Sequence, residues 1–212
     1  MAQRTIHYLF GELICREIPL SDKKRFLLGS ILPDAIDTAN RDTSHFIVET
    51  RTHKFFDFAA FRNQYPDLIN QDDLYLGYYM HLVEDAFYRA FFYNSNYTMP
   101  RSREEVPMLH QDYHILNDYI VKKYQLQNCF DLTISLKDTP LLDLTTFYVD
   151  KLLTDLSNDF TEQTQGKTTY ITEQMLDLSV EHYIPLAIAE VKSMQAGTSL
   201  LQVSDFIWPN QR

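Results

Sequence analysis

The sequence predicts an all-α protein, folded as a single-domain bundle of about six to eight helices. Two observations lead to this fold class. The 212 residues include only 5 Gly and 8 Pro, whereas a β-sandwich or barrel would need turn residues every ~8–12 positions. Apolar residues also recur at spacings of three and four along most of the chain. The length suits one hydrophobic core, which stays workable up to roughly 250 residues, so we expect residues 1–212 to form one domain.

Seven segments have the periodicity of helices. Asp22 or Ser21 can cap the second, and Pro33 should end it by disfavouring helical geometry at the preceding residue. Pro185 should kink the last helix, and Gly197 should stop it. The fourth is apolar nearly all round, so we expect it at the centre, and we expect the tail FIWPNQR to dock as a strap. The expected helices are residues 4–18, 23–32, 55–65, 71–94, 107–124, 141–160 and 172–195.

Composition and charge restrict the possible partners. The net charge of −10 makes nucleic acid an unlikely partner and disfavours an anionic membrane surface, because both require a basic face. A small anionic substrate remains compatible if a metal ion supplies positive charge locally. No apolar run approaches the ~20 residues of a transmembrane helix, and we expect a cytoplasmic protein. The sequence leaves the oligomeric state open.

The apolar fourth helix carries two ionisable residues, His81 and Asp85, in the stretch GYYMHLVEDAFYR. Residues four apart lie on the same face of a helix, so these two side chains project together. Burying an unpartnered charge costs several kcal/mol, so the pair needs an explanation. Two interpretations stay open at this point: a buried ion pair, or half of a metal site.

A second pair with the same spacing favours metal binding. His110 and His114 lie on one face of the helix HQDYHILNDY, which is how helical bundles present metal ligands inward. His7, Asp34 and His45 each lie beside apolar residues near an expected helix end. Imidazole and carboxylate together suit zinc or another late divalent metal. The candidate ligands are therefore His7, Asp34, His45, His81, Asp85, His110 and His114.

The order and context of these residues resemble the zinc-dependent phospholipase C family, whose fold and metal cluster are shared with single-strand-specific zinc nucleases. The resemblance covers residues 5–125, and the last third of the chain matches only as generic helix. The chain would be a divergent, cytoplasmic member. The motifs are IHYLFG with His7, GSILPD with Asp34, SHF with His45, GYYMHLVED with His81 and Asp85, and HQDYHILNDYIVKKY with His110 and His114.

The resemblance implies an all-α hydrolase that binds one to three zinc ions. A water between the metals would be acidified towards hydroxide and would attack phosphorus. By analogy, Asp34 would be the catalytic residue that orients or deprotonates this water. The resemblance implies that Asp34, His45, His81 and Asp85 bind one ion, that Asp85 bridges to a second ion held by His7, and that His110 and His114 belong to a third.

The sequence also departs from the family pattern. Phe91 stands where relatives have a further imidazole, and His114 stands where they have a carboxylate. The chain opens with MAQRTI, whereas secreted relatives use a mature N-terminal tryptophan as a ligand. Ala35 replaces the aromatic residue that follows the metal aspartate in phospholipases, so choline-lipid specificity has no support. We therefore expect the site around Asp34 and His81 to be more complete than the others.

Arg89 is the candidate substrate-binding residue. It lies one turn beyond Asp85, where it could bind a phosphate through two hydrogen bonds or hold a metal-ligating carboxylate. The alternative is that its side chain simply extends from the core to water. His53 and His182 have no ligand-spaced partner and are expected to be ordinary surface or boundary residues. No His-Asp dipeptide, HExxH or GxSxG motif occurs in the sequence.

The sequence thus predicts a metal-dependent phosphoesterase, with zinc as the favoured ion and another divalent metal as an option. The substrate would be a small phosphate ester, either a phosphodiester or a phospholipid-like head group. The alternative is a non-catalytic metal-binding or partner-binding protein that keeps the fold with a degenerate site. The residues that depart from the family pattern keep this alternative open.

Overall fold

The computed structural model describes residues 2–37, 39–93, 97–130, 136, 139, 141 and 147–209. The described chain is predominantly helical, as expected, with a small three-stranded antiparallel sheet in the order β1-β2-β3. The strands are β1 (Ile47–Glu49), β2 (His53–Phe56) and β3 (Trp208–Pro209). The helices are α1 (Arg4–Glu17), α2 (Lys23–Ile31), η1 (Leu32–Asp34), α3 (Arg41–Ser44), α4 (Phe58–Gln64), α5 (Leu68–Gln71), α6 (Asp73–Tyr93), α7 (Val106–Lys123), α8 (Val149–Thr161), α9 (Glu173–Gln195) and η3 (Val203–Phe206).

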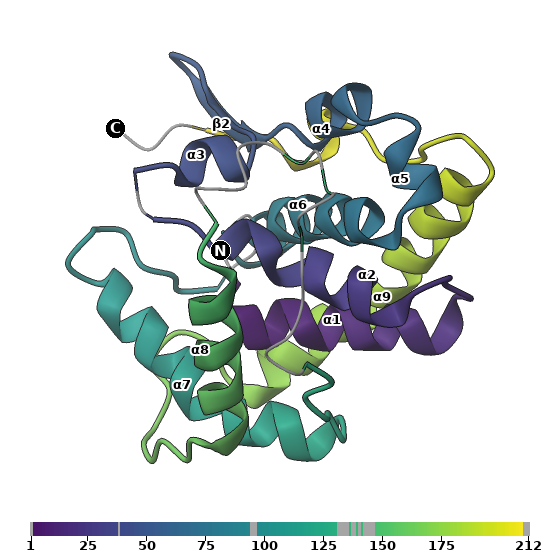
Figure 1. The fold of residues 1–212 in the computed structure, drawn as a ribbon. Coiled ribbons are helices and arrows are strands. Elements are labelled where there is room, and N and C mark those ends of the chain that lie inside the picture. Colours follow the sequence, from purple (N-terminus) through teal and green to yellow (C-terminus); the bar gives the residue numbers. More distant parts are fainter. Residues whose placement is uncertain are drawn as a thin grey trace.

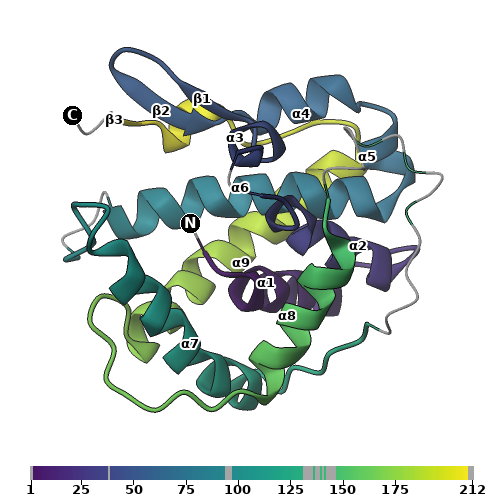
Figure 2. The same cartoon turned by 60° about the vertical axis from the view of Figure 1, so that its left-hand side comes forward.

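Helix α6 is the central element of the fold. In both views the sheet, α3 and α4 lie on one side of α6, while α1, α7 and α8 lie on the other (Figures 1 and 2). Sixteen of its residues are buried, which agrees with the expectation that the most apolar helix occupies the centre. No described helix is both long and apolar enough to cross a membrane.

Capping residues set several helix boundaries, and two of them, Asp22 and Gly197, were expected. The Asp22 side chain accepts a hydrogen bond from the backbone N–H of Arg25 at the start of α2. Thr172 caps α9 in the same way, through the N–H of Met175. Gly197 follows α9 with a φ of +83°, a left-handed conformation that glycine adopts without the steric cost of a side chain. These local signals were sufficient to place both helices.

Three expected segments differ in the structure. The helix expected over residues 55–65 begins only at Phe58, because Asp57 accepts a hydrogen bond from Ala60 N–H and acts as its N-cap. Phe56, just before it, is buried in β2. The helix expected over residues 141–160 begins at Val149, and residues 142–146 lie outside the described chain. The expected strap does dock, but as strand β3, and residues 210–212 lie outside the described chain.

Helices α2 and α6 make the closest backbone contact in the core, and two glycines allow it. A Cβ atom added to Gly77 would lie 2.1 Å from the Phe26 carbonyl oxygen, and one added to Gly29 would lie 2.1 Å from the Leu74 carbonyl oxygen. Neither position can accept a side chain unless one helix backbone shifts. The contact also brings the C-terminal end of α2 against the N-terminal half of α6.

Replacing Gly77 by alanine should test this contact. Alanine normally stabilises a helix interior by about 0.5–1 kcal/mol relative to glycine. Here overpacking against backbone should outweigh that gain, and we expect the free energy of unfolding to fall by at least about 2 kcal/mol. Urea denaturation measures the change. Gly11→Ala is the matched control, because its added methyl would meet only side chains of Ser30 and Leu27. Equal effects of the two substitutions would contradict the argument.

Candidate metal centre

Five of the predicted ligands, all from the N-terminal half of the chain, form one cluster. The three imidazoles and Asp85 are fully buried, whereas the Asp34 side chain remains 21% exposed. The ligands come from α1, the end of η1, the residue after α3, and two successive turns of α6. In chain order they are His7, Asp34, His45, His81 and Asp85.

The donor atoms of this cluster are spaced as ligands of a shared ion would be. Nε2 of His45 lies 3.3 Å from Oδ1 of Asp34, and Nε2 of His81 lies 3.7 Å from Oδ2 of Asp85. Nε2 of His7 lies 3.7 Å from one oxygen of each carboxylate. Ligands on a tetrahedral zinc, with bonds of ~2.0–2.1 Å, are separated by roughly 3.3 Å. The observed separations are close to this value.

The outer ring nitrogens of two imidazoles face backbone carbonyl groups. Nδ1 of His81 lies 2.8 Å from the Ser30 carbonyl oxygen, and Nδ1 of His45 lies 3.1 Å from the Arg41 carbonyl oxygen. A carbonyl only accepts, so Nδ1 of His81 must carry the proton and donate it. Nδ1 of His45 also lies 2.9 Å from the Ser44 hydroxyl, which can donate to it or accept from it. Nε2 of the neutral His81 ring is then an acceptor that faces Asp85. Two acceptors facing each other in a buried site repel, and a cation between them removes the repulsion.

Glu84 orients the third imidazole. Its Oε2 forms a 2.9 Å ion pair with Nδ1 of His7, and both side chains are buried. Burial alone would lower the pKa of His7, but the neighbouring carboxylates, Glu84 first, raise the pKa to about 9. Burial raises the pKa of Glu84 to about 7, against the opposing effect of His7. A carboxylate on Nδ1 directs Nε2 into the centre and increases its basicity as a ligand.

Buried polar atoms without hydrogen bonds show that these residues fit a metal ion. Nε2 of His7, Nε2 of His81 and Oδ2 of Asp85 have no hydrogen-bond partner in the described chain. Leaving such groups unsatisfied costs about 1–3 kcal/mol each, and more for a charged group. The rings of His7 and His81 stack with centroids 3.8 Å apart, which presents both Nε2 atoms side by side. The set can therefore hold a metal ion.

The protonation states of His81 and Asp34 also suit a metal, whereas His7, with a pKa of about 9, would have to release a proton as the metal binds. Burial and the neighbouring His7 lower the pKa of His81 well below its ordinary value, so this imidazole is neutral, as a ligand must be. Burial would raise the pKa of Asp34, but a hydrogen bond with His45 and the nearby imidazoles lower it far below its ordinary value. Asp34 is thus a carboxylate at neutral pH.

The cluster opens into a cavity of about 630 Å³. Asp34 and His45 form part of its wall, so the cluster is accessible to a small molecule. The basic residues of the wall are Arg4, Arg41, Lys54 and Arg89, and its aromatic residues are Phe56, Tyr93, Tyr113 and Trp208. The predicted substrate-binding residue, Arg89, is therefore in the cavity with the metal ligands.

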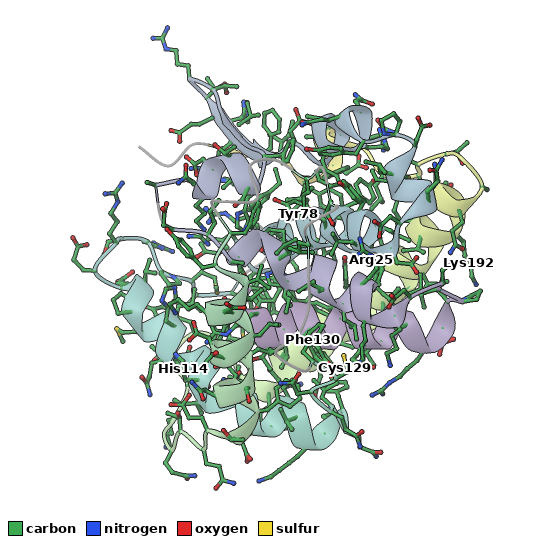
Figure 3. The ribbon with its side chains drawn as sticks, in the orientation of Figure 1. Arg25, Tyr78, His114, Cys129, Phe130 and Lys192 are labelled. Carbon is green, nitrogen blue, oxygen red and sulfur yellow. The ribbon has the colours of Figure 1, made fainter. Side chains whose placement is uncertain are left out.

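His110 and His114 line the same cavity but do not join the five-residue cluster. His114 lies on α7 beside α8 (Figure 3), where its Nδ1 is 3.4 Å from Oε2 of Glu162. With Asp159 these residues form a separate group of possible ligands. His110 stacks on Tyr113, with centroids 6.4 Å apart, and burial lowers its pKa. The structure thus places the two histidines on the wall of the same cavity but outside the five-residue cluster.

The separate group around His114 is a weaker site, because its carboxylate already has partners. Asp159 forms an ion pair with Nε of Arg4 at 2.7 Å, and it accepts hydrogen bonds from Nη2 of Arg4 and from the Thr5 hydroxyl, each at 3.2 Å. A cation there would lie beside the Arg4 guanidinium and would compete with it. The expected third metal site stays a prediction.

Sequence reasoning missed the groups that orient the ligands. Glu84 is a second carboxylate on an apolar helix, next to Asp85. This position in the sequence could have identified it as a functional residue. The Ser30 and Arg41 carbonyl groups give no signal in a sequence, because their roles depend on how α2 and α3 pack against α6. Trp208, 119 positions beyond Arg89, also gave no signal.

No protein-family model, curated protein or solved structure matches this chain. The resemblance to zinc-dependent phospholipase C therefore remains a prediction that rests on the motifs, while the candidate metal centre rests on the geometry described above.

Removing a central ligand should remove the metal. We expect protein purified without chelator to contain about one or more divalent metal ions per chain, and His81→Ala to lose most of this content, because His81 belongs to both groups of ligands in the cluster. Mass spectrometry of the elements measures it. His53→Ala, an exposed histidine of β2, is the control. Fresh wild-type protein with less than about 0.2 ions per chain would refute the centre.

Replacing Glu84 by glutamine should weaken metal binding without removing a ligand. The amide can still accept from Nδ1 of His7, but it lacks the charge that increases the basicity of Nε2. We expect about 10-fold weaker zinc affinity, measured by competition with a chromogenic chelator. Glu12→Gln, in the same region and paired with Lys23 at 2.9 Å, should leave the affinity unchanged. A similar loss in both variants would indicate a general effect of lost charge.

Proposed function

We propose that the protein is a metal-dependent hydrolase of phosphate esters, with zinc as the preferred ion. One observation carries the proposal: three buried imidazoles and two carboxylates form two overlapping groups of possible metal ligands, with buried atoms of His7, His81 and Asp85 left without hydrogen bonds, beside a cavity whose wall also contains basic side chains. Imidazole with carboxylate is the ligand set of zinc hydrolases. Phosphate esters carry the negative charge that such a cavity would balance.

The chain's residues would hold one ion or two. Asp34, His45, His81 and Asp85 would bind the first, and His7, with Asp85 as a bridge, would bind the second. When bound, the metal supplies Lewis acidity, which polarises the phosphoryl oxygen and lowers the pKa of a coordinated water. The backbone carbonyls and Glu84 keep the imidazoles in the required orientation.

Asp34 is the best candidate for the catalytic carboxylate. Its side chain is 21% exposed, whereas that of Asp85 is fully buried. It therefore faces the cavity from which water and substrate would enter. Because its pKa lies far below the ordinary value, Asp34 is a weak base at neutral pH. Its role would be to accept a hydrogen bond from the attacking water and so orient it, rather than to remove the proton of that water.

The cavity supports a small substrate. Its volume of about 630 Å³ falls in the range of small-molecule sites, roughly 300–1,000 Å³. Although the net charge of the chain is −10, basic residues on the cavity wall provide positive charge inside the cavity. The aromatic residues would contact the organic part of the ester. A phosphodiester or a phospholipid-like head group fits these features, and long nucleic acid does not, because it requires a basic face.

Hydrolysis of chromogenic phosphodiesters and monoesters tests the proposal. We expect turnover that stops with chelator and returns with zinc. We expect Asp34→Asn to lower kcat about 10²–10⁴-fold when it is assayed with excess zinc, which compensates for the loss of a carboxylate ligand. Asp37→Asn is the matched control, since Asp37 lines the same cavity without belonging to the cluster. Metal-replete protein without turnover on any ester, lipids included, would exclude the enzyme.

A non-catalytic metal-binding protein is the second candidate. The position of His110 and His114 away from the cluster favours it, because a centre with fewer ions has less charge to stabilise a phosphoryl transition state. This protein would bind metal with the same ligands and show no hydrolysis. Metal analysis and the ester assays together separate the two candidates.

A further inference from the structure

The C-terminal strand contributes to the cavity wall. Trp208 in β3 pairs with Lys54 of β2, packs against Phe56 with ring centroids 5.3 Å apart, and is only 6% exposed. Its ring also lines the cavity that contains the candidate metal centre. In Figure 2 the sheet lies over the left-hand end of α6, close to the chain's N-terminal end. A segment far from the metal ligands in sequence thus reaches their cavity.

Arg89 lies against this tryptophan. Its guanidinium carbon is 4.0 Å from the ring centroid of Tyr93 and 4.9 Å from the ring of Trp208. Its Nε atom is buried without a hydrogen-bond partner in the described chain. Aromatic rings contact the face of a guanidinium, so this packing leaves the N–H groups at its edge free to donate.

The other basic residues of the cavity wall have different surroundings. Arg4 is paired with Asp159 at 2.7 Å, and Lys54 is paired with Glu49 at 3.3 Å. No carboxylate of the described residues forms an ion pair with Arg89, although Asp85 lies one turn before it on α6. Burial lowers the pKa of Arg89, which shows that its charge is desolvated. A desolvated guanidinium without an acid partner is suited to bind an anion from outside the chain.

We propose that Arg89 is a subsite for the phosphate oxygens of the ligand, and that Trp208 is its positioning residue. The assignment to a substrate phosphate rests on the proposed function; the binding of an oxyanion does not. Arg89 follows Asp85 by four residues, so the two side chains start about 5–6 Å apart on one face of α6. A phosphate at the metal centre is therefore within reach of the guanidinium edge, which offers two parallel N–H groups to two oxygens.

The sole tryptophan of the chain reports directly on this subsite. The sequence contains one Trp, so intrinsic tryptophan fluorescence comes from Trp208 alone. Titration of the protein, as purified with its metal, with inorganic phosphate at constant ionic strength should give a saturable change in emission. Sodium chloride over the same range should give none. Absence of a saturable phosphate response up to tens of millimolar would overturn the inference.

Arg89→Met tests the guanidinium, and Lys54→Met is its control. Both remove one positive charge from the same cavity wall, but Arg89 is the one whose charged group lies over the tryptophan ring. We expect phosphate affinity to fall about 10-fold or more in Arg89→Met, the size of a lost charge-assisted hydrogen bond, and to change less than about 3-fold in Lys54→Met. Equal losses would mean that phosphate responds only to overall charge, and would overturn the subsite.

Substitutions of Trp208 test the positioning role, with calorimetry as the binding measurement because the fluorophore is removed. Trp208→Phe keeps a ring over the guanidinium and should bind phosphate within about 3-fold of wild type, whereas Trp208→Leu should bind about 3–10-fold more weakly. Circular dichroism and thermal unfolding show whether the variants remain folded. Wild-type affinity in folded Trp208→Leu would overturn the positioning role, and so would an equal loss in both variants.

The outcome is distinguishable from that of the proposed function. Phosphate binding that depends on Arg89, in a protein that hydrolyses no ester, would support the subsite and refute the enzyme. Ester hydrolysis with unchanged KM in Arg89→Met would support the enzyme and refute the subsite. If both are correct, Arg89→Met should raise KM more than it lowers kcat, while metal content stays at the wild-type level.

Discussion

The close packing of α2 on α6 is the constraint on which the candidate centre depends. Gly29 and Gly77 let the two backbones approach to a distance that no side chain would permit. The approach brings the Ser30 carbonyl to Nδ1 of His81, and η1, which continues directly from α2, carries Asp34 to the same place. A shift of either helix would misplace an imidazole and a carboxylate together. The site therefore depends on two residues that have no side chain and touch no ligand.

Local periodicity was enough to predict part of this centre. His81 and Asp85 share one face of a helix whatever its surroundings, so their proximity follows from the spacing alone. His7, Asp34 and His45 lie on other elements, and their convergence was inferred only from the order of motifs in a resembling family. The same reasoning grouped His110 and His114 with metal ligands. Their spacing was read correctly, but spacing alone does not determine which ligands share an ion, and their role as metal ligands stays a prediction.

The sheet shows where helical reasoning ends. Residues 47–49, 53–56 and 208–209 form short strands, and the pairing of β2 with β3 joins segments that lie more than a hundred positions apart. Strands of two to four residues are too short for an alternating pattern to be distinguished from loop or helix. Phe55 and Phe56 were consequently assigned to the start of a helix, although Asp57 caps that helix one residue later. The contact between Trp208 and Arg89 follows from this pairing and could not be predicted without it.

Electrostatics links the centre to the rest of the cavity. The protein carries a net charge of −10. Three of its carboxyl groups, those of Asp34, Glu84 and Asp85, lie within one small region. Among the neighbouring imidazoles, His7 carries a positive charge at neutral pH, because its pKa is raised to about 9. His81 stays neutral because it is buried. Divalent cations at the cluster would reverse the sign of the local field, since their charge is concentrated where water is excluded. An anion could then enter a cavity whose outer surface repels it. The guanidinium of Arg89, which forms no ion pair with a carboxylate of the described residues, would add to the attraction at the point where the anion meets the metal.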